Sequence, residues 1–204
     1  MPIFFQHQIN ETSRLGIWKI EETEEFFLSN VPLQKEVTHR HKRLQHLAGR
    51  FLLQFLFPDF PYELIRIADT RKPYLPDEHY HFSISHCGDY AAAIVSSTHR
   101  VGIDIEIPSD KVDRIKGKFL SESEKMFYSQ LVTLDSRLPT LLWCAKESIF
   151  KWYGNGQVDF RKHIQLKQVH RGSQTIHCFF EKTNQSLTIY YHQFDQLLVA
   201  WVIS

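Results

Sequence analysis

Apolar side chains recur at steps of three and four residues between positions 39 and 57, a spacing that predicts an amphipathic helix. A basic stripe runs beside the apolar one and consists of His39, Arg43, His46 and Arg50. Cations in the first turn of a helix oppose the helix dipole. We therefore expect either solvent or a bound anion to compensate the charge at this end of the helix.

A proline-rich stretch separates this helix from two predicted strands. Residues 58–76 hold half of the chain's prolines and predict turns rather than regular structure. Residues 81–86 then alternate between apolar and polar side chains, and residues 90–95 are almost continuously apolar. With a turn at residues 87–89, these two segments predict a β-hairpin.

The clearest strand pattern, at residues 101–107, carries two carboxylates on one face. Asp104 and Glu106 are two residues apart, so the strand period of two places them side by side, with Gly102 next to them. Such close like charges are relieved by exposure to solvent, by protonation, or by a hard cation such as Mg²⁺. On this pattern alone, a solvated strand face is the commoner interpretation and a ligand site is the alternative.

Helical patterns and then strands fill the second half of the chain. The helical patterns span about 109–117, 121–130 and 138–153, and alternating strands span 164–203. Ser121 and Glu124 are three residues apart, which predicts a capping box at the start of the middle helix.

The last predicted helix carries Glu147 and Lys151 four residues apart, the spacing of a surface ion pair worth about 0.2–0.5 kcal/mol. Two bulky aromatic residues, Trp143 and Phe150, stand on either side of this polar face. We therefore expect the pair to be partly buried, which leaves a role in chemistry open.

The composition is that of a packed protein rather than a disordered or polyanion-coated chain. The 204 residues include 24 Lys or Arg and 23 Asp or Glu, for a net charge of +1, and 43% are apolar. Three widely spaced cysteines predict free thiols, and we find neither a targeting pattern nor an apolar run long enough for a membrane helix. We expect a cytoplasmic protein that binds neither nucleic acid nor membranes.

Three ordered motifs resemble those of the 4′-phosphopantetheinyl transferases. VGIDIE at 101–106, FLSESE at 119–124 and WCAKESIFK at 143–151 follow the family pattern of G-I/V-D-x-E, F-x-S-x-x-E and W/F-x-x-K-E-S/A-x-x-K. The similarity continues upstream in KRLQHLAGR, RKPYLP and FSISHCGDYAA, and so covers residues 42–151. Each motif is weak alone, whereas the ordered set is highly specific.

The resemblance implies an enzyme that transfers 4′-phosphopantetheine from coenzyme A to a serine hydroxyl of an apo acyl, peptidyl or polyketide carrier protein. Such an enzyme releases 3′,5′-ADP and uses Mg²⁺ or Mn²⁺. The chain length and the glutamate at position 106 are similar to the larger, monomeric surfactin-synthetase-activator type rather than to the half-length trimeric synthases.

The resemblance also implies a fold and its division of labour. We expect an α+β protein of two similar halves, 1–98 and 99–204, each an antiparallel sheet packed on a long helix. The first half would form the nucleotide side of the coenzyme A site, and the second half would carry the magnesium and catalytic motifs.

The family's functional positions carry over residue by residue. The magnesium ligands would be Asp104, Glu106 and Glu147. Lys151 would contact the phosphate and Glu124 would be the general base, with Glu122 two residues away as a competitor for that role. The nucleotide and its 3′-phosphate would be bound by Arg43, Arg50, Lys72, Ser85 and His86.

Two other functions fit part of the pattern. A magnesium nuclease also combines acids with a lysine, but its Glu and Lys stand two apart on a strand, and this chain lacks the basic surplus that nucleic acid requires. A protein that only binds carriers or nucleotides would leave the ordered acids without a purpose. The sequence leaves open which carrier is modified and whether acyl-coenzyme A is accepted.

Overall fold

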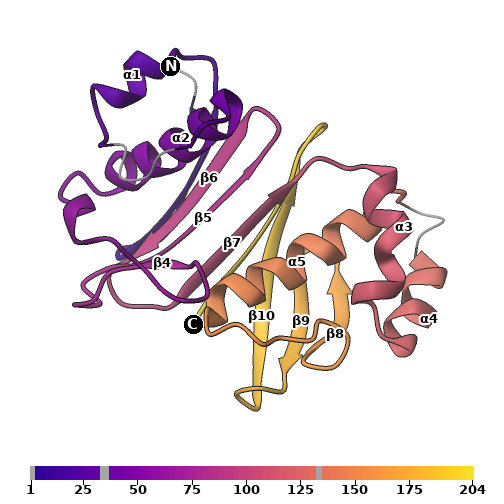
Figure 1. Ribbon diagram of the computed structural model, residues 1–204. Helices are drawn as coiled ribbons and strands as arrows, with labels where there is room; N and C mark the ends of the chain where they lie inside the picture. The colour runs from indigo at the N-terminus through magenta and orange to yellow at the C-terminus, as the bar shows by residue number, and fades with distance from the viewer. Residues whose placement is uncertain (1–2, 33–36, 132–134) are drawn as a thin grey trace. The chain divides into compact units, whose positions relative to one another are not determined.

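The computed structural model describes residues 3–32, 37–131 and 135–204 and confirms the predicted α+β class (Figure 1). Contacts between residues divide the chain into two compact units, Met1–Ile103 and Asp104–Ser204. In each unit a sheet packs against one long helix. No helix in these described ranges is long and apolar enough to cross a membrane.

The first unit is built on a sheet with the strand order β1-β2-β6-β5, in which every neighbouring pair is antiparallel. Its long helix, α2 (Arg40–Leu56), packs on β2, β5 and β6, and the short helix α1 (Glu24–Leu28) packs on α2. The predicted helix and hairpin are therefore confirmed. The strands of this sheet are β1 (Ile3–Asn10), β2 (Ser13–Lys19), β5 (His81–Cys87) and β6 (Tyr90–Ser96).

The segment between α2 and β5 is irregular, as its prolines predicted. It contains a 3₁₀ turn at Tyr62–Leu64 and the paired two-residue strands β3 (Arg66–Ile67) and β4 (Pro73–Tyr74). Arg71, in the turn between these two strands, has a φ of 65°, in the left-handed region that favours glycine.

Gly49 allows α2 to approach the sheet closely. A Cβ atom at this position would lie 2.6 Å from Cγ2 of Ile84 on β5, well inside the separation at which carbon atoms attract one another. Its neighbours Ala48 and Leu52 are fully buried. This glycine therefore sets the distance between the helix and the sheet.

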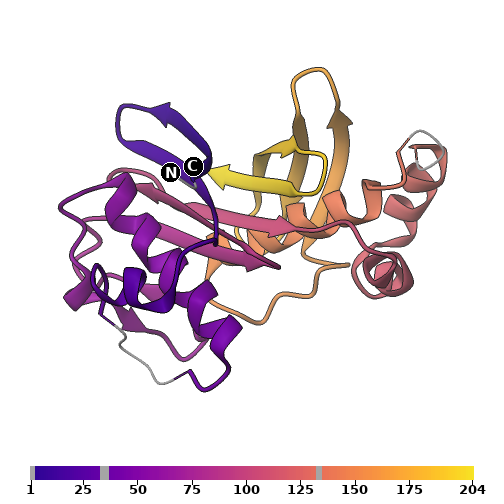
Figure 2. The ribbon, with the colours of Figure 1, turned by 90° about the horizontal axis from the view of Figure 1, so that it is seen from above.

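The second unit is built on a sheet with the order β7-β11-β10-β9-β8. Helix α5 (Leu138–Tyr153) packs on β8, β10 and β11, and α3 (Asp110–Phe119) and α4 (Glu122–Leu131) pack beside α5 (Figure 2). These elements confirm the predicted helices and strands of this part of the chain. The strands are β7 (Val101–Glu106), β8 (Ile164–His170), β9 (Thr175–Phe180), β10 (Gln185–Gln193) and β11 (Leu198–Ile203).

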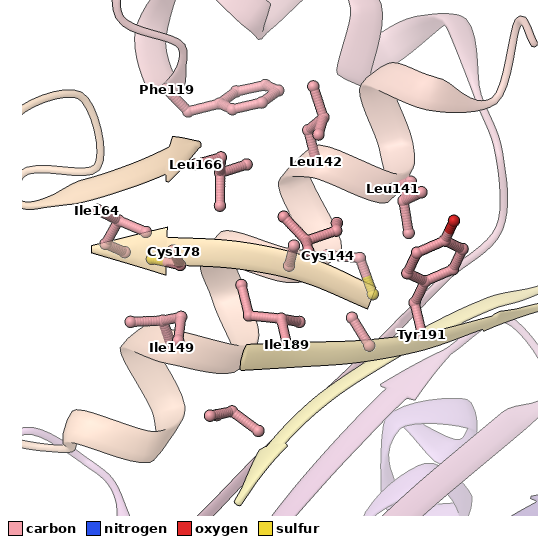
Figure 3. Close-up of a cluster of buried hydrophobic side chains, with 14 of the residues drawn as sticks. Phe119, Leu141, Leu142, Cys144, Ile149, Ile164, Leu166, Cys178, Ile189 and Tyr191 are labelled. Carbon is pink, nitrogen blue, oxygen red and sulfur yellow. The ribbon is translucent and has the colours of Figure 1, made fainter. Parts of the chain in front are cut away.

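The core of the second unit lies between α5 and the sheet. Cys144 and Ile149 of α5 pack among side chains of the sheet that include Cys178 and Ile189 (Figure 3). All three cysteines of the chain are free thiols, as expected. Gly154 ends α5 with a φ of 75°, a conformation that glycine adopts without strain.

The two acids of strand β7 are less exposed than a solvated strand face would be. Residues Val101 to Ile105 are all buried, Asp104 is only 4% exposed, and Glu106 is partly buried. An alternating pattern shows which residues share a face, but it does not show what covers that face. The interpretation of the two acids as a solvated strand face is therefore wrong.

Candidate active site

Strand β7 and helix α5 bring Asp104 and Lys151 together. Nζ of Lys151 lies 2.6 Å from Oδ1 of Asp104. Cys144, on the same helix, donates from Sγ to the backbone oxygen of Asp104 at 3.0 Å and links α5 to β7. Lys151 therefore supplies positive charge to a carboxylate that is buried, where an uncompensated charge is very unfavourable.

Glu147 precedes Lys151 by one helical turn and lies within electrostatic reach of both acids of β7. Burial and then the charge of Asp104 raise the pKa of Glu147 to about 7, Lys151 opposes this shift, and Glu106 adds to it. These four groups, Asp104, Glu106, Glu147 and Lys151, are called the acidic cluster below. The cluster contains the three predicted magnesium ligands and the predicted phosphate-binding lysine.

Glu106 is oriented by an indole. Nε1 of Trp143 donates to Oε1 of Glu106 at 3.1 Å. The Trp143 ring packs against two others, that of Phe119 at a centroid distance of 5.1 Å and that of Phe160 at 5.6 Å. Glu147 and Lys151, on the polar face that these aromatic residues flank, are both partly buried, as the sequence predicted.

The donor set of the acidic cluster suits a hard divalent cation, although its side chains do not form a ready coordination sphere. Among the residues that the structure describes, no group of three or more His, Cys, Asp or Glu side chains is arranged to hold a metal ion. Carboxylates are nevertheless the ligands that Mg²⁺ prefers. A cation would offset the charges of Asp104 and Glu106, which add to burial in raising the pKa of Glu147. Binding therefore requires at least some of these carboxylates to move from the positions described here.

An open pocket of about 1000 Å³ lies beside Glu147. Its apolar walls include Phe119, Trp143, Phe150 and Phe160, and polar side chains complete its lining. This pocket, called the aromatic pocket below, offers space for a flexible substrate group next to the acidic cluster.

Glu124 is committed to contacts inside the protein. It forms the predicted capping box with Ser121, because Oε2 accepts from the Ser121 N–H at 2.7 Å while the Glu124 N–H donates to Oγ of Ser121 at 3.3 Å. Oε2 also lies 2.8 Å from Nζ of Lys146, and Oε1 accepts from the Leu166 N–H at 2.8 Å. Glu124 is 3% exposed. These contacts do not favour the predicted role of general base.

Lys146 is a functional candidate that the sequence reasoning missed. Its side chain is completely buried, and its ammonium group donates to Glu124 and to three backbone oxygens, those of Phe119, Phe160 and Ile164. Burial lowers the pKa of Lys146, while Glu124 opposes this shift. A signal was present in the sequence, since Lys146 follows Leu142 by four residues and therefore lies on an apolar face of the helix.

Arg43 has an internal anion as its partner. Its guanidinium makes two contacts with the carboxylate of Glu24, at 2.5 Å and 2.9 Å, and donates to the backbone oxygen of Val37 at 2.7 Å. The carboxylate of Glu24 therefore compensates the positive charge of Arg43 at this end of α2. A phosphate that binds Arg43 must compete with Glu24.

The other predicted nucleotide-binding residues also belong to the first unit. Arg50 is buried and donates from Nε to Nε2 of His46 at 2.9 Å. Burial, and secondarily the charge of Arg100, lowers the pKa of Lys72 to about 8. On β5, Ser85 is buried and His86 is exposed.

Comparison with known proteins identifies the family. The 4′-phosphopantetheinyl transferase superfamily matches residues 100–202, which include the entire acidic cluster.

Enterobactin synthase component D of Escherichia coli (strain K12) is 36% identical over 115 residues, 55% of this chain and 55% of that protein. The 4′-phosphopantetheinyl transferase gsp of Aneurinibacillus migulanus is 34% identical over 114 residues, 54% of this chain and 46% of that protein. The chain spans about half the length of these curated relatives. By its matched half and its ordered motifs, the chain belongs to the 4′-phosphopantetheinyl transferase superfamily.

Proposed function

We propose that the protein transfers 4′-phosphopantetheine from coenzyme A to a serine hydroxyl of an apo carrier protein and releases 3′,5′-ADP. The observation that carries the proposal is the acidic cluster, three carboxylates and a lysine gathered on β7 and α5 inside the region that matches the superfamily. The name of one relative, a component of enterobactin synthase, supports a carrier of such a synthase as the acceptor. The two units of one chain support the larger, monomeric type.

The reaction moves a phosphoryl group, so it depends on positive charge at the phosphates and needs no nucleophile from the enzyme. Asp104, Glu106 and Glu147 would hold Mg²⁺ or Mn²⁺, which when bound neutralises charge on the pyrophosphate. Lys151 would exchange its contact with Asp104 for the transferred or leaving phosphate. The carrier serine oxygen forms the new bond to phosphorus as the bond to 3′,5′-ADP breaks, so no covalent enzyme intermediate is required.

The contacts of Glu124 do not favour the prediction that it accepts the serine proton. Glu124 matches the family's base, but its two oxygens already accept hydrogen bonds from Ser121, Lys146 and Leu166. We therefore give Glu124 a structural role and propose that the serine proton passes to solvent.

The nucleotide of coenzyme A would be held by residues of the first unit. We retain Arg50, Lys72, Ser85 and His86 for this role. Arg43 joins them only if the 3′-phosphate displaces Glu24 from its guanidinium. Glu24→Gln is therefore expected to lower the KM for coenzyme A, whereas an unchanged KM would remove Arg43 from the set.

Intact mass spectrometry of apo carriers tests the function. The protein is incubated with coenzyme A, Mg²⁺ and acyl, peptidyl and polyketide carriers, and at least one carrier is expected to gain one phosphopantetheine. Asp104→Asn and Glu106→Gln should lose most of the transfer, whereas Asp113→Asn, at an exposed acid of α3 that pairs with Lys116, should transfer as wild type does. A panel without any modified carrier would reject the function, and full turnover in both site variants would reject the site.

A further inference from the structure

The indole of Trp143 connects the acidic cluster to a rigid part of the second unit. On one side, its N–H donates to Oε1 of Glu106 at 3.1 Å. On the other, its ring packs against Phe119, with an interplanar angle of 66°, and Phe160, with an angle of 34°. The indole is therefore held in place by contacts that do not involve Glu106.

Hydrogen bonds from Lys146 anchor the backbone of the two residues whose rings pack against the indole. Nζ of Lys146 donates to the backbone oxygen of Phe119 at 2.9 Å and to that of Phe160 at 2.8 Å. Phe119 ends α3, whereas Phe160 lies in the segment between α5 and β8. One buried ammonium group thus joins two distant segments on either side of Trp143.

We propose that Trp143 is a positioning residue that holds the carboxylate of Glu106 in the orientation required to bind the divalent cation. This inference rests on the proposed function, in which Glu106 is a magnesium ligand. The Glu106 side chain has several rotatable bonds, and fixing them on cation binding is entropically unfavourable. A hydrogen bond that already restrains the carboxylate of Glu106 through Oε1 removes part of this penalty.

An indole suits this role better than a charged donor does. A lysine or arginine in its place would pair with Glu106 and repel the cation, whereas the indole is an uncharged group that only donates. Groups that orient a metal ligand typically raise the affinity for the metal by about 10- to 100-fold. We expect a contribution of this size from Trp143.

The test compares two tryptophans of the same helix. Trp143→Phe keeps an aromatic ring beside Phe119 and Phe160 and removes the N–H that donates to Glu106. Trp152→Phe is the matched control, because Nε1 of Trp152 donates to Oγ of Ser204 at 3.0 Å. Binding of Mn²⁺ and Mg²⁺ is measured directly by calorimetry, without coenzyme A, together with the melting temperature of each protein.

Trp143→Phe is expected to bind Mn²⁺ about 10- to 100-fold more weakly than wild type with little change in melting temperature. Trp152→Phe should bind as wild type does. A second variant, Phe160→Leu, keeps the N–H but loosens the ring that holds it, and should show a smaller loss of affinity. Wild-type affinity in Trp143→Phe would overturn the inference, whatever the result with Phe160→Leu.

Glu106→Gln separates this inference from the proposed function. If Glu106→Gln also binds Mn²⁺ as wild type does, Glu106 is not a ligand and the proposed metal site itself is wrong. If Glu106→Gln loses affinity while Trp143→Phe retains it, the metal site stands and only the role of Trp143 is rejected.

Discussion

Replacing Glu124 with glutamine separates a structural carboxylate from a general base. The substitution keeps the shape of the side chain and removes the charge that faces Lys146 at 2.8 Å in a fully buried site. Breaking one partner of a buried ion pair lowers the free energy of unfolding by about 3–5 kcal/mol. Three backbone oxygens still surround the Lys146 ammonium group, which favours the lower part of that range.

A second loss adds to the first. Glu124 also accepts from the N–H groups of Ser121 and Leu166, and the amide of glutamine can accept through one oxygen only. One of these donors is left without its acceptor, at about 1–2 kcal/mol. We expect a total near 4 kcal/mol, which corresponds to a fall in melting temperature of about 8–16 °C for a protein of this size.

Urea unfolding, followed by circular dichroism, measures the stability, and single-turnover transfer is measured on the same preparation at low temperature. Glu122→Gln is the control, because Glu122 is 76% exposed and pairs with Lys125 at the surface, where the expected change is below about 1 kcal/mol. Abolished transfer with wild-type stability would refute our reasoning and restore Glu124 as the base.

Three further predictions concern charge and packing. The pKa of Glu147 is raised from 4.5 to about 7, so the folded state binds the proton more tightly and the free energy of unfolding falls as the pH rises from 4.5 to 7. In urea unfolding without divalent cations, Glu147→Gln should abolish this dependence of stability on pH and gain about 3 kcal/mol at pH 8. The same pH dependence in variant and wild type would contradict this prediction. Lys151→Met should lose transfer by orders of magnitude and destabilise the protein by about 1–3 kcal/mol, because Asp104 stays buried without its partner at 2.6 Å. In thermal unfolding, Mg²⁺ should stabilise this variant more than it stabilises the wild type. Gly49→Ala should destabilise by about 1–2 kcal/mol, since its Cβ would lie 2.6 Å from Ile84, and Ile84→Leu should restore part of that loss; a Gly49→Ala protein more stable than wild type would disprove the close approach.

Local periodicity was sufficient for most of the secondary structure. The stripe between residues 39 and 57 predicted α2 because burial of one apolar face is what stabilises such a helix. Likewise, the capping box at Ser121 and Glu124 could be predicted because both of its hydrogen bonds join residues three apart. Contacts of this range are encoded by neighbouring letters of the sequence.

The partners of the charged residues could not be predicted in this way. Lys146 contacts Glu124 across 22 residues, and Arg43 contacts Glu24 across 19 residues. No spacing rule for a helix or a strand relates such positions, since only the packing of whole elements brings them together. The residue types therefore predicted which side chains are charged, but not which of them form ion pairs with other side chains of the same chain.

The cysteines of the second unit affect how the protein meets thiols. Burial raises the pKa of Cys144 well above its ordinary value and that of Cys178 to about 12. A thiol that stays protonated exchanges slowly with disulfides, because the thiolate is the attacking species. Coenzyme A, the proposed substrate, ends in a thiol, and so does the phosphopantetheine arm that the carrier would receive. Cys144 and Cys178 are therefore expected to form mixed disulfides only slowly with the oxidised form of such a thiol.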